Sequence, residues 1–174
     1  MGELIEFSIV SSNKSLYTDM LNFLEHYLSS DNEEPIISIM DNWYYDNKIK
    51  INSLKEAEDF METKIVTVEK NIQHESIGVF IEKNKNGYII DCWINLDKEI
   101  IGKQYTDLIN EIIKCFKGNR KLIICGIGKE ISIDYDRKII ESIKESHNID
   151  CWIVSKQFYI DNELSKLNLN VNII

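Results

Sequence analysis

The chain has few of the residues that build catalytic and metal sites. Only three of its 174 residues are histidines, and His26, His74 and His147 lie far apart. The four cysteines fall in no metal-ligand spacing, and they are Cys92, Cys115, Cys125 and Cys151. Each sits singly in an apolar pattern, which favours buried, reduced thiols that behave as small hydrophobes. We therefore expect no bound metal, no disulfide framework and no cofactor, and we find no motif that commits the chain to an enzymatic reaction.

Long apolar runs are also missing. No stretch approaches the roughly 18 consecutive apolar residues of a membrane span, and the longest clean run covers residues 122–128. The first residues lack the basic region and apolar core of a signal peptide. The sequence therefore predicts a cytoplasmic protein that neither spans nor binds a membrane.

Positive charge is scarce as well. Acidic residues number 29 against 20 basic ones, which gives a formal net charge of −9. Such a chain repels nucleic acids and anionic membranes, both of which bind through basic patches, and it attracts basic partners. An acid excess of this size also serves plain solubility, so the charge alone does not identify a partner.

The chain has one proline, Pro35, and a composition typical of a globular protein, with 44% apolar and 28% charged residues. Its length predicts a single domain over residues 1–174. Alternating or β-branched runs predict strands at 3–10, 35–45, 48–51, 65–69, 77–83 and 88–96. Helical spacing predicts helices from residue 16 and over 54–63, and Asn86-Gly87 predicts a hairpin between the last two strands.

The last third has a different pattern. Helical periodicity over 104–116, ended by Gly118, is followed by a buried strand at 122–125. A helix over 139–143, capped by Asp134 or Asp136, precedes another buried strand at 151–154. Alternation of strands and helices from 88 to 155 predicts two right-handed crossovers. The expected fold is α+β: one mixed sheet, antiparallel in its N-terminal and central part and a parallel βαβαβ unit at its C-terminal part, with helices packed on it.

Two segments could be mistaken for catalytic sites. Gly126-Ile127-Gly128-Lys129 follows a buried strand but lacks the further glycine of a dinucleotide fingerprint and the Ser or Thr of a P-loop, so we interpret it as a turn. Asp97, Asp134 and Asp136 fall near strand ends or helix starts, where carboxylates could hold Mg²⁺. A small Mg²⁺-dependent hydrolase or phosphoryl-transfer enzyme is therefore the first alternative function.

Aromatic and acidic residues combine in two places. If the segment 40–47 is extended, Asp41, Trp43 and Tyr45 share one face, and Asp46 lies on the other with Asn42 and Tyr44. Asp91 and Trp93 repeat the combination on the predicted hairpin, in a pentapeptide (Ile-Asp-Cys-Trp-Ile) that recurs at 149–153. Aromatic rings and carboxylates are suited to the centre of an interface with a basic protein. The alternative is that one aromatic face packs under a helix. The predicted partner-binding residues are Asp41, Trp43, Tyr45, Asp46, Asp91 and Trp93.

An acidic, single-domain α+β chain with such strands and no catalytic set resembles the immunity proteins of bacterial polymorphic-toxin and contact-dependent inhibition systems. The segment that carries the resemblance is 87–117, where the strand 88–94 leads into an amphipathic helix. The resemblance implies a non-enzymatic inhibitor that binds and neutralises a cognate, basic toxin domain. Besides the enzyme, the remaining alternative is a structural or regulatory adaptor module.

Overall fold

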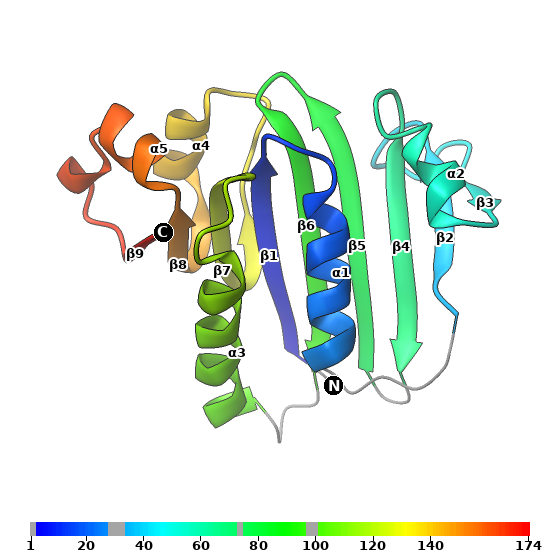
Figure 1. The fold of residues 1–174 in the computed structure, drawn as a ribbon, viewed down its shortest axis with the longest axis horizontal. Helices are drawn as coiled ribbons and strands as arrows, with labels where there is room; N and C mark the ends of the chain where they lie inside the picture. The colour runs from blue at the N-terminus through cyan, green and yellow to red at the C-terminus, as the bar shows by residue number, and fades with distance from the viewer. Residues whose placement is uncertain (1–2, 28–33, 73–74, 97–100) are drawn as a thin grey trace.

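The protein was analysed as a computed structural model, which describes residues 3–27, 34–72, 75–96 and 101–174 (Figure 1). The described residues form a nine-stranded sheet in the order β3-β2-β4-β5-β6-β1-β7-β8-β9. Its strands are β1 (Glu3–Ser11), β2 (Ile36–Met40), β3 (Ile49–Ile51), β4 (Ile65–Ile72), β5 (Glu75–Asn84), β6 (Gly87–Leu96), β7 (Leu122–Ser132), β8 (His147–Val154) and β9 (Val171–Ile173). The helices are α1 (Leu16–Tyr27), α2 (Leu54–Glu58), α3 (Ile101–Phe116), α4 (Ile139–Glu145), α5 (Lys156–Asp161) and the 3₁₀ turn η1 (Leu164–Lys166).

The strand β1 lies in the middle of the sheet, between β6 and β7, and is antiparallel to both. In the β1–β6 register, Ser8 is opposite Asp91 and Glu6 is opposite Trp93. The predicted hairpin joins β5 to β6 with Asn84 opposite Gly87, whose φ of 133° lies in the region that only glycine adopts freely. The sheet thus brings side chains far apart in sequence onto adjacent strands.

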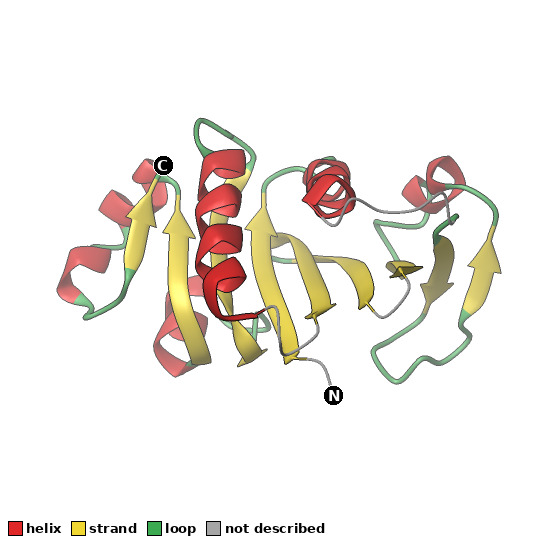
Figure 2. Ribbon diagram, turned by 90° about the horizontal axis from the view of Figure 1, so that it is seen from below, coloured by secondary structure: helices red, strands yellow, loops and turns green. Residues whose placement is uncertain are grey.

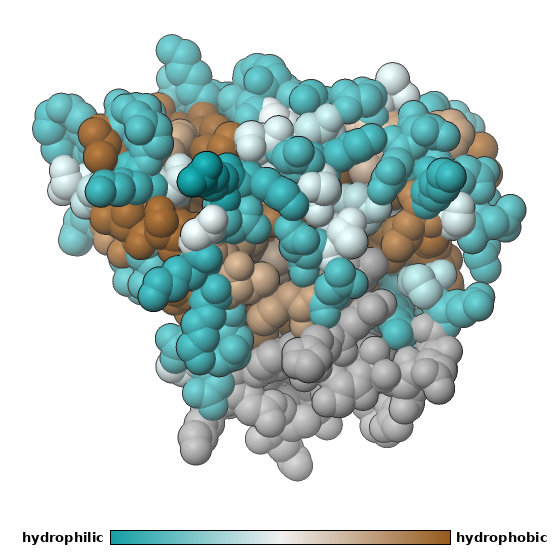
Figure 3. Space-filling view, in the orientation of Figure 1, coloured by the Kyte–Doolittle hydropathy of each residue, from teal (hydrophilic) through white to brown (hydrophobic). Residues whose placement is uncertain are grey.

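One face of the sheet is covered by α1, α2 and α3 (Figure 2). The apolar stripe of α3 is buried there through Leu108, Ile112 and Phe116, and α1 contributes Leu16 and Met20. Alternate residues of the strands fill the other side of this core, as period-two patterning predicts. Figure 3, which views this side, shows mostly hydrophilic residues over the helices, with apolar patches toward the two ends of the sheet.

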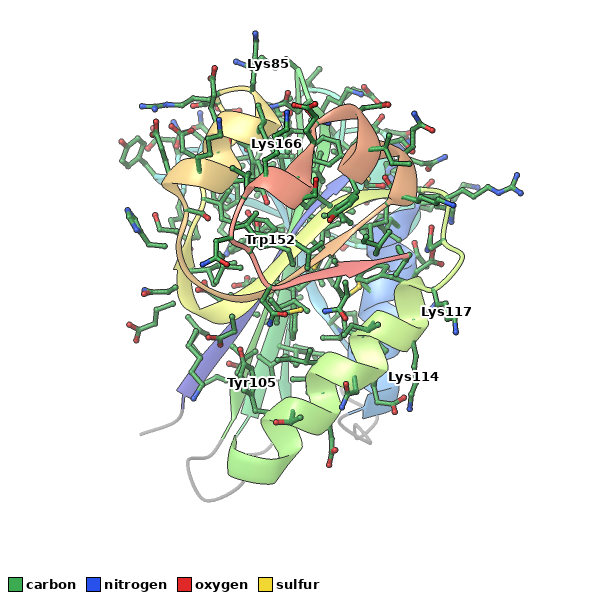
Figure 4. The ribbon with its side chains drawn as sticks, turned by 90° about the vertical axis from the view of Figure 1, so that its left-hand side faces the viewer. Lys85, Tyr105, Lys114, Lys117, Trp152 and Lys166 are labelled. Carbon is green, nitrogen blue, oxygen red and sulfur yellow. The ribbon has the colours of Figure 1, made fainter. Side chains whose placement is uncertain are left out.

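The opposite face is covered only in part. A second apolar cluster packs α4, α5 and η1 against β7 and β8, with Ile143, Trp152 and Leu164 buried in it. Trp152 points from β8 toward the C-terminal helices (Figure 4), and its ring lies over Gly126, its register partner on β7. No described helix covers the remainder of this face, over β4, β5, β6 and β1 (Figure 2). We call this region the open face. No helix in the described part of the chain has the length and apolarity needed to cross a membrane.

The predicted α+β class and single mixed sheet are confirmed. Parallel pairing does occur in the C-terminal part, but between β8 and β9, whereas β7 and β8 are antiparallel. The expected parallel pairing of β7 with β8 was therefore wrong. The connection through residues 133–146, which contains the short helix α4, brings the chain back beside β7 in antiparallel register. By contrast, the longer α3 returns the chain, so β6 and β7 run in the same direction, with β1 between them.

Three local predictions were also wrong. The Gly126-Ile127-Gly128-Lys129 segment is no turn but part of β7, where Gly126 makes room for Trp152 and a side chain at Gly128 would collide with the carbonyl oxygen of Asn148. The N-cap of α4 is Lys138 and not an aspartate. Of the four cysteines, Cys115 is exposed, and the other three are buried as expected.

Candidate functional site: an aromatic–acidic cavity

The open face carries a cavity of about 390 Å³. Its floor comes from β1 and β6, and its walls come from β4, β5, the loop after β2 and the end of β7. We call it the aromatic–acidic cavity, and its lining residues are Leu4, Glu6, Phe7, Ser8, Trp43, Tyr45, Glu69, Phe80, Asp91, Cys92, Trp93, Ile131 and Ile133. A cavity of this size with a few polar groups among apolar walls has the usual form of a binding site.

The wall of the cavity is a row of three aromatic rings. Phe80 lies between the two tryptophans, with its ring centre 5.2 Å from that of Trp43 and 4.6 Å from that of Trp93. The Trp43 indole nitrogen donates a hydrogen bond to Glu82 Oε2 over 2.9 Å, which fixes the outer end of the row. Such edge and tilted contacts hold the rings in place without an overlying helix.

The position of Trp93 depends on a glycine. Gly78 is opposite Trp93 in the β5–β6 register, and the indole ring lies over it. A Cβ atom at Gly78 would stand 1.7 Å from Trp93 Cη2, far inside van der Waals contact. The recurring pentapeptide therefore places each tryptophan over a glycine of the neighbouring strand, Trp93 on the open face and Trp152 under the C-terminal helices.

Replacing Gly78 by alanine is expected to push the Trp93 ring out of its place and to lower the free energy of unfolding by about 1–3 kcal/mol. The displacement should shift the NMR signal of the Trp93 indole N–H. Val79→Ala is the matched control, because Val79 lies next to Gly78 but is buried in the helix-covered core. It should lower stability and leave the Trp93 signal unchanged. An unshifted Trp93 signal in Gly78→Ala would contradict the described packing.

The floor carries two carboxylates that have neutral hydrogen-bond partners. Ser8 donates its hydroxyl to Asp91 Oδ1, and the backbone N–H of Ile131 donates to Glu6 Oε2 over 2.7 Å. Burial raises the pKa of Asp91 to about 6, with smaller contributions from the negative charges of Glu6 and Glu82. Burial likewise raises the pKa of Glu6. Both acids are thus held where their charged forms are disfavoured.

A second hollow of about 190 Å³ adjoins the cavity and shares Trp43, Asp91 and Ile133 with it. Its remaining lining includes three more acidic residues, Glu82, Asp134 and Asp136. No lysine or arginine is among the described residues that line either hollow. The combined surface is therefore aromatic and acidic.

One lysine of the chain lies near the rim of the cavity. Lys48 forms an ion pair with Glu69 over 3.0 Å, and its ammonium lies 5.2 Å from the centre of the Tyr45 ring. A cation is therefore already bound there by one carboxylate and one aromatic ring, the two groups that the cavity contains in larger number.

Four of the six residues predicted from the sequence meet in this cavity: Trp43, Tyr45, Asp91 and Trp93. The other two do not line it. The Asp41 carboxylate binds Lys64 and Asn47, hydrogen bonds that hold the pKa of Asp41 below its ordinary value. Asp46 accepts a hydrogen bond from the Asn42 amide over 2.9 Å.

The structure also corrects the expected conformation of residues 41–47. β2 ends at Met40, and the segment beyond it is a loop in place of the predicted extended strand with two faces. The Asn42 side-chain oxygen accepts the N–H of Tyr44 over 2.9 Å, a turn that asparagine favours. Tyr45 and Asn47 have positive φ values of 63° and 52°. The loop, and not strand alternation, brings Trp43 and Tyr45 to the same cavity.

Sequence reasoning missed several cavity residues, chiefly Glu6, Ser8, Glu69 and Phe80. A signal for them was present, because each alternates with core positions on its strand: Phe80, for example, lies between Val79 and Ile81, which face the helices. The sequence did not predict the order of the strands, which brings these positions together in the cavity.

The alternative metal site is not assembled by the described residues. Asp134 forms an ion pair with Arg137 over 3.4 Å, and its carboxylate also accepts the N–H of Asp136 over 2.9 Å. Asp97 lies outside the described residues. Within the described ranges, no three His, Cys, Asp or Glu side chains are grouped so that they could hold a metal ion.

Comparisons with known proteins gave one likeness. No family model and no curated protein matches the chain. Among solved structures, it is similar to a chain in the crystal structure of the toxic C-terminal tip of CdiA from Pseudomonas aeruginosa in complex with immune protein. The two chains are 14% identical, with a TM-score of 0.43 over 75% of this chain and 88% of the other.

Proposed function

We propose that this chain is a non-enzymatic binding protein, an immunity protein that neutralises a basic toxin domain by binding it at the aromatic–acidic cavity. The observation that carries the proposal is the cavity itself. Three aromatic rings in edge and tilted contact and two partly buried carboxylates lie together on the open face, and no described basic residue lines the cavity. Large aromatic groups anchor interfaces, and unpaired carboxylates select a cationic partner.

The charge of the whole chain supports the same proposal. A net charge of −9 steers a cationic partner toward the protein and speeds association at low salt. The second hollow extends the acidic surface beyond the cavity, so that a partner of ordinary interface size would contact both. A cytoplasmic site of action completes this proposal.

The test is co-expression with the protein encoded immediately upstream, scored by growth and by co-purification. The neighbour should arrest growth when expressed alone, and this chain should restore growth and elute with it. The complex should weaken about tenfold or more between 50 and 500 mM NaCl because its attraction is electrostatic. A toxic neighbour that this chain neither binds nor neutralises would remove the proposal, as would a harmless neighbour with no complex.

A further inference from the structure

We infer that the aromatic–acidic cavity receives a single arginine side chain of the partner protein, with its guanidinium between Glu6 and Asp91 and against the aromatic row. The identity of that partner as a toxin rests on the proposed function. The binding of an arginine side chain in the cavity does not depend on the proposed function. Four observations carry the inference.

First, the two floor carboxylates are neighbours, and no lysine or arginine in the described part of the chain forms an ion pair with either of them. Asp91 is opposite Ser8, and Glu6 lies two residues from Ser8 on the same face of β1. Diagonal neighbours of this kind are about 7–8 Å apart, and their charges repel each other. The hydrogen bonds that the structure gives them come from a hydroxyl and a backbone N–H, and occupy one oxygen of each. A cation between them would remove a repulsion that the folded chain tolerates when it is alone.

Second, the third cavity carboxylate is already neutralised. Lys48 holds Glu69 at the rim and lies over the Tyr45 ring. Among the described residues, this lysine neutralises Glu69 and leaves Glu6 and Asp91 without an ion-pair partner. It also marks the rim as the place where a second cation would enter beside Tyr45.

Third, the wall next to this pair is aromatic. Trp93 is opposite Glu6 in the β1–β6 register, and Phe80 is opposite Asp91 across β5 and β6. Each carboxylate therefore has an aromatic ring on the adjoining strand and on the same face. These carboxylates and rings line one cavity, so a cation held there can add cation–π attraction to its ion pairs.

Fourth, these groups fit a guanidinium better than an ammonium. A guanidinium is planar, stacks on aromatic rings and carries five N–H donors in a rigid fork, so that it can bond two separate carboxylates at once. An ammonium is a compact and strongly hydrated charge that cannot stack. The volume of about 390 Å³ accepts the long arginine side chain together with the chain segment that carries it.

The test titrates the ¹⁵N-labelled protein with N-acetyl-arginine amide and follows the indole N–H signals of its tryptophans. The signals of Trp43 and Trp93 should move saturably, with a dissociation constant on the order of 1 mM for so small a probe. The signal of Trp152, which is buried under the C-terminal helices, serves as the internal reference and should stay in place. N-acetyl-citrulline amide, which has the same shape without the charge, should produce no saturable shift, and N-acetyl-lysine amide should bind more weakly than the arginine probe.

Two variants complete the experiment. Asp91→Asn should weaken the arginine probe about tenfold or more, whereas Glu141→Gln, at an exposed position on α4, should leave its affinity unchanged. The inference is overturned if the citrulline or lysine probe binds as well as arginine, if the signals of Trp43 and Trp93 stay in place, or if Asp91→Asn binds like the wild type. Because this titration needs no toxin, probe binding without a co-purified partner counts against the proposed function alone. A complex that survives Asp91→Asn, in a protein that does not bind the probe, counts against this inference alone.

Discussion

Asp91→Asn is expected to make the isolated protein more stable at neutral pH while it weakens binding of the partner. The pKa of the buried carboxyl is about 6, against an ordinary value of 3.8. The folded chain therefore holds the proton more tightly than the unfolded chain between about pH 4 and pH 6. As pH rises through this window the free energy of unfolding falls, and the loss is complete above it. An asparagine avoids that cost and still accepts the Ser8 hydroxyl, so the gain at pH 7.5 should be on the order of 2–3 kcal/mol.

Urea unfolding of wild type and variant at pH 7.5 and pH 3 measures this effect directly. The stabilities should converge at the acidic end and separate at pH 7.5, because Asp91 is neutral in both states only when the pH is low. Glu6, whose pKa is also raised, is present in both proteins, so the difference between them reports mainly on Asp91. A variant less stable than the wild type at pH 7.5 would show that the ionised carboxylate stabilises the fold. If Asp91 lowers the stability of the fold, its presence is better explained by binding than by folding.

Trp43→Ala is expected to remove about 2 kcal/mol or more of binding free energy, with little change in the stability of the isolated protein. The side chain is 42% exposed and lies in a loop, so few core contacts are lost. It ends the aromatic row through its contact with Phe80 and its hydrogen bond to Glu82. Removing the Trp43 side chain therefore takes away the outer end of the aromatic wall and leaves the sheet intact.

Tyr44→Ala provides the matched control, because Tyr44 is the next residue in the same loop, is 87% exposed and is not part of the cavity lining. It should bind the partner like the wild type. Calorimetric titration of the partner with both variants, together with their melting temperatures, separates the two roles of Trp43. Should Trp43→Ala melt several degrees lower and bind normally, Trp43 would be a packing residue and the assignment of the cavity would fail.

Most strands and helices of this fold could be predicted because each has a local sequence pattern. Period-two alternation marks β1, β5 and β6, and helical spacing marks α3, whose end at Gly118 has the expected positive φ of 78°. The order of the strands has no such local signal. The insertion of β1 between β6 and β7 depends on which faces bury best against one another over the entire chain. The parallel pair was placed wrongly for the same reason.

The residues of the candidate site also differ in whether a local pattern could predict them. Asp91 and Trp93 could be predicted together because they share one face of one strand. Trp43 and Tyr45 line the same cavity, but a turn at Asn42, and not the expected strand, brings them together. Glu6 could not be connected with Asp91, because nothing local shows that β1 and β6 are neighbours. The residue types indicated the chemistry of the candidate site, but the pairing of the strands determined which residues line it.

Because β1 lies between β6 and β7, the cavity can form only after the ribosome has synthesised β7. Glu6 and the N–H group of Ile131 that it binds are 125 residues apart. At a translation rate of about 5–20 residues per second, β1 waits roughly 6–25 s for the segment that closes the cavity. A nascent chain that has not yet been extended past Ile133 lacks both β7 beside β1 and the wall formed by Ile131 and Ile133. Under the proposed function, protection against a toxin that arrives suddenly would have to come from molecules completed beforehand, which favours continuous production of the protein over induction on demand.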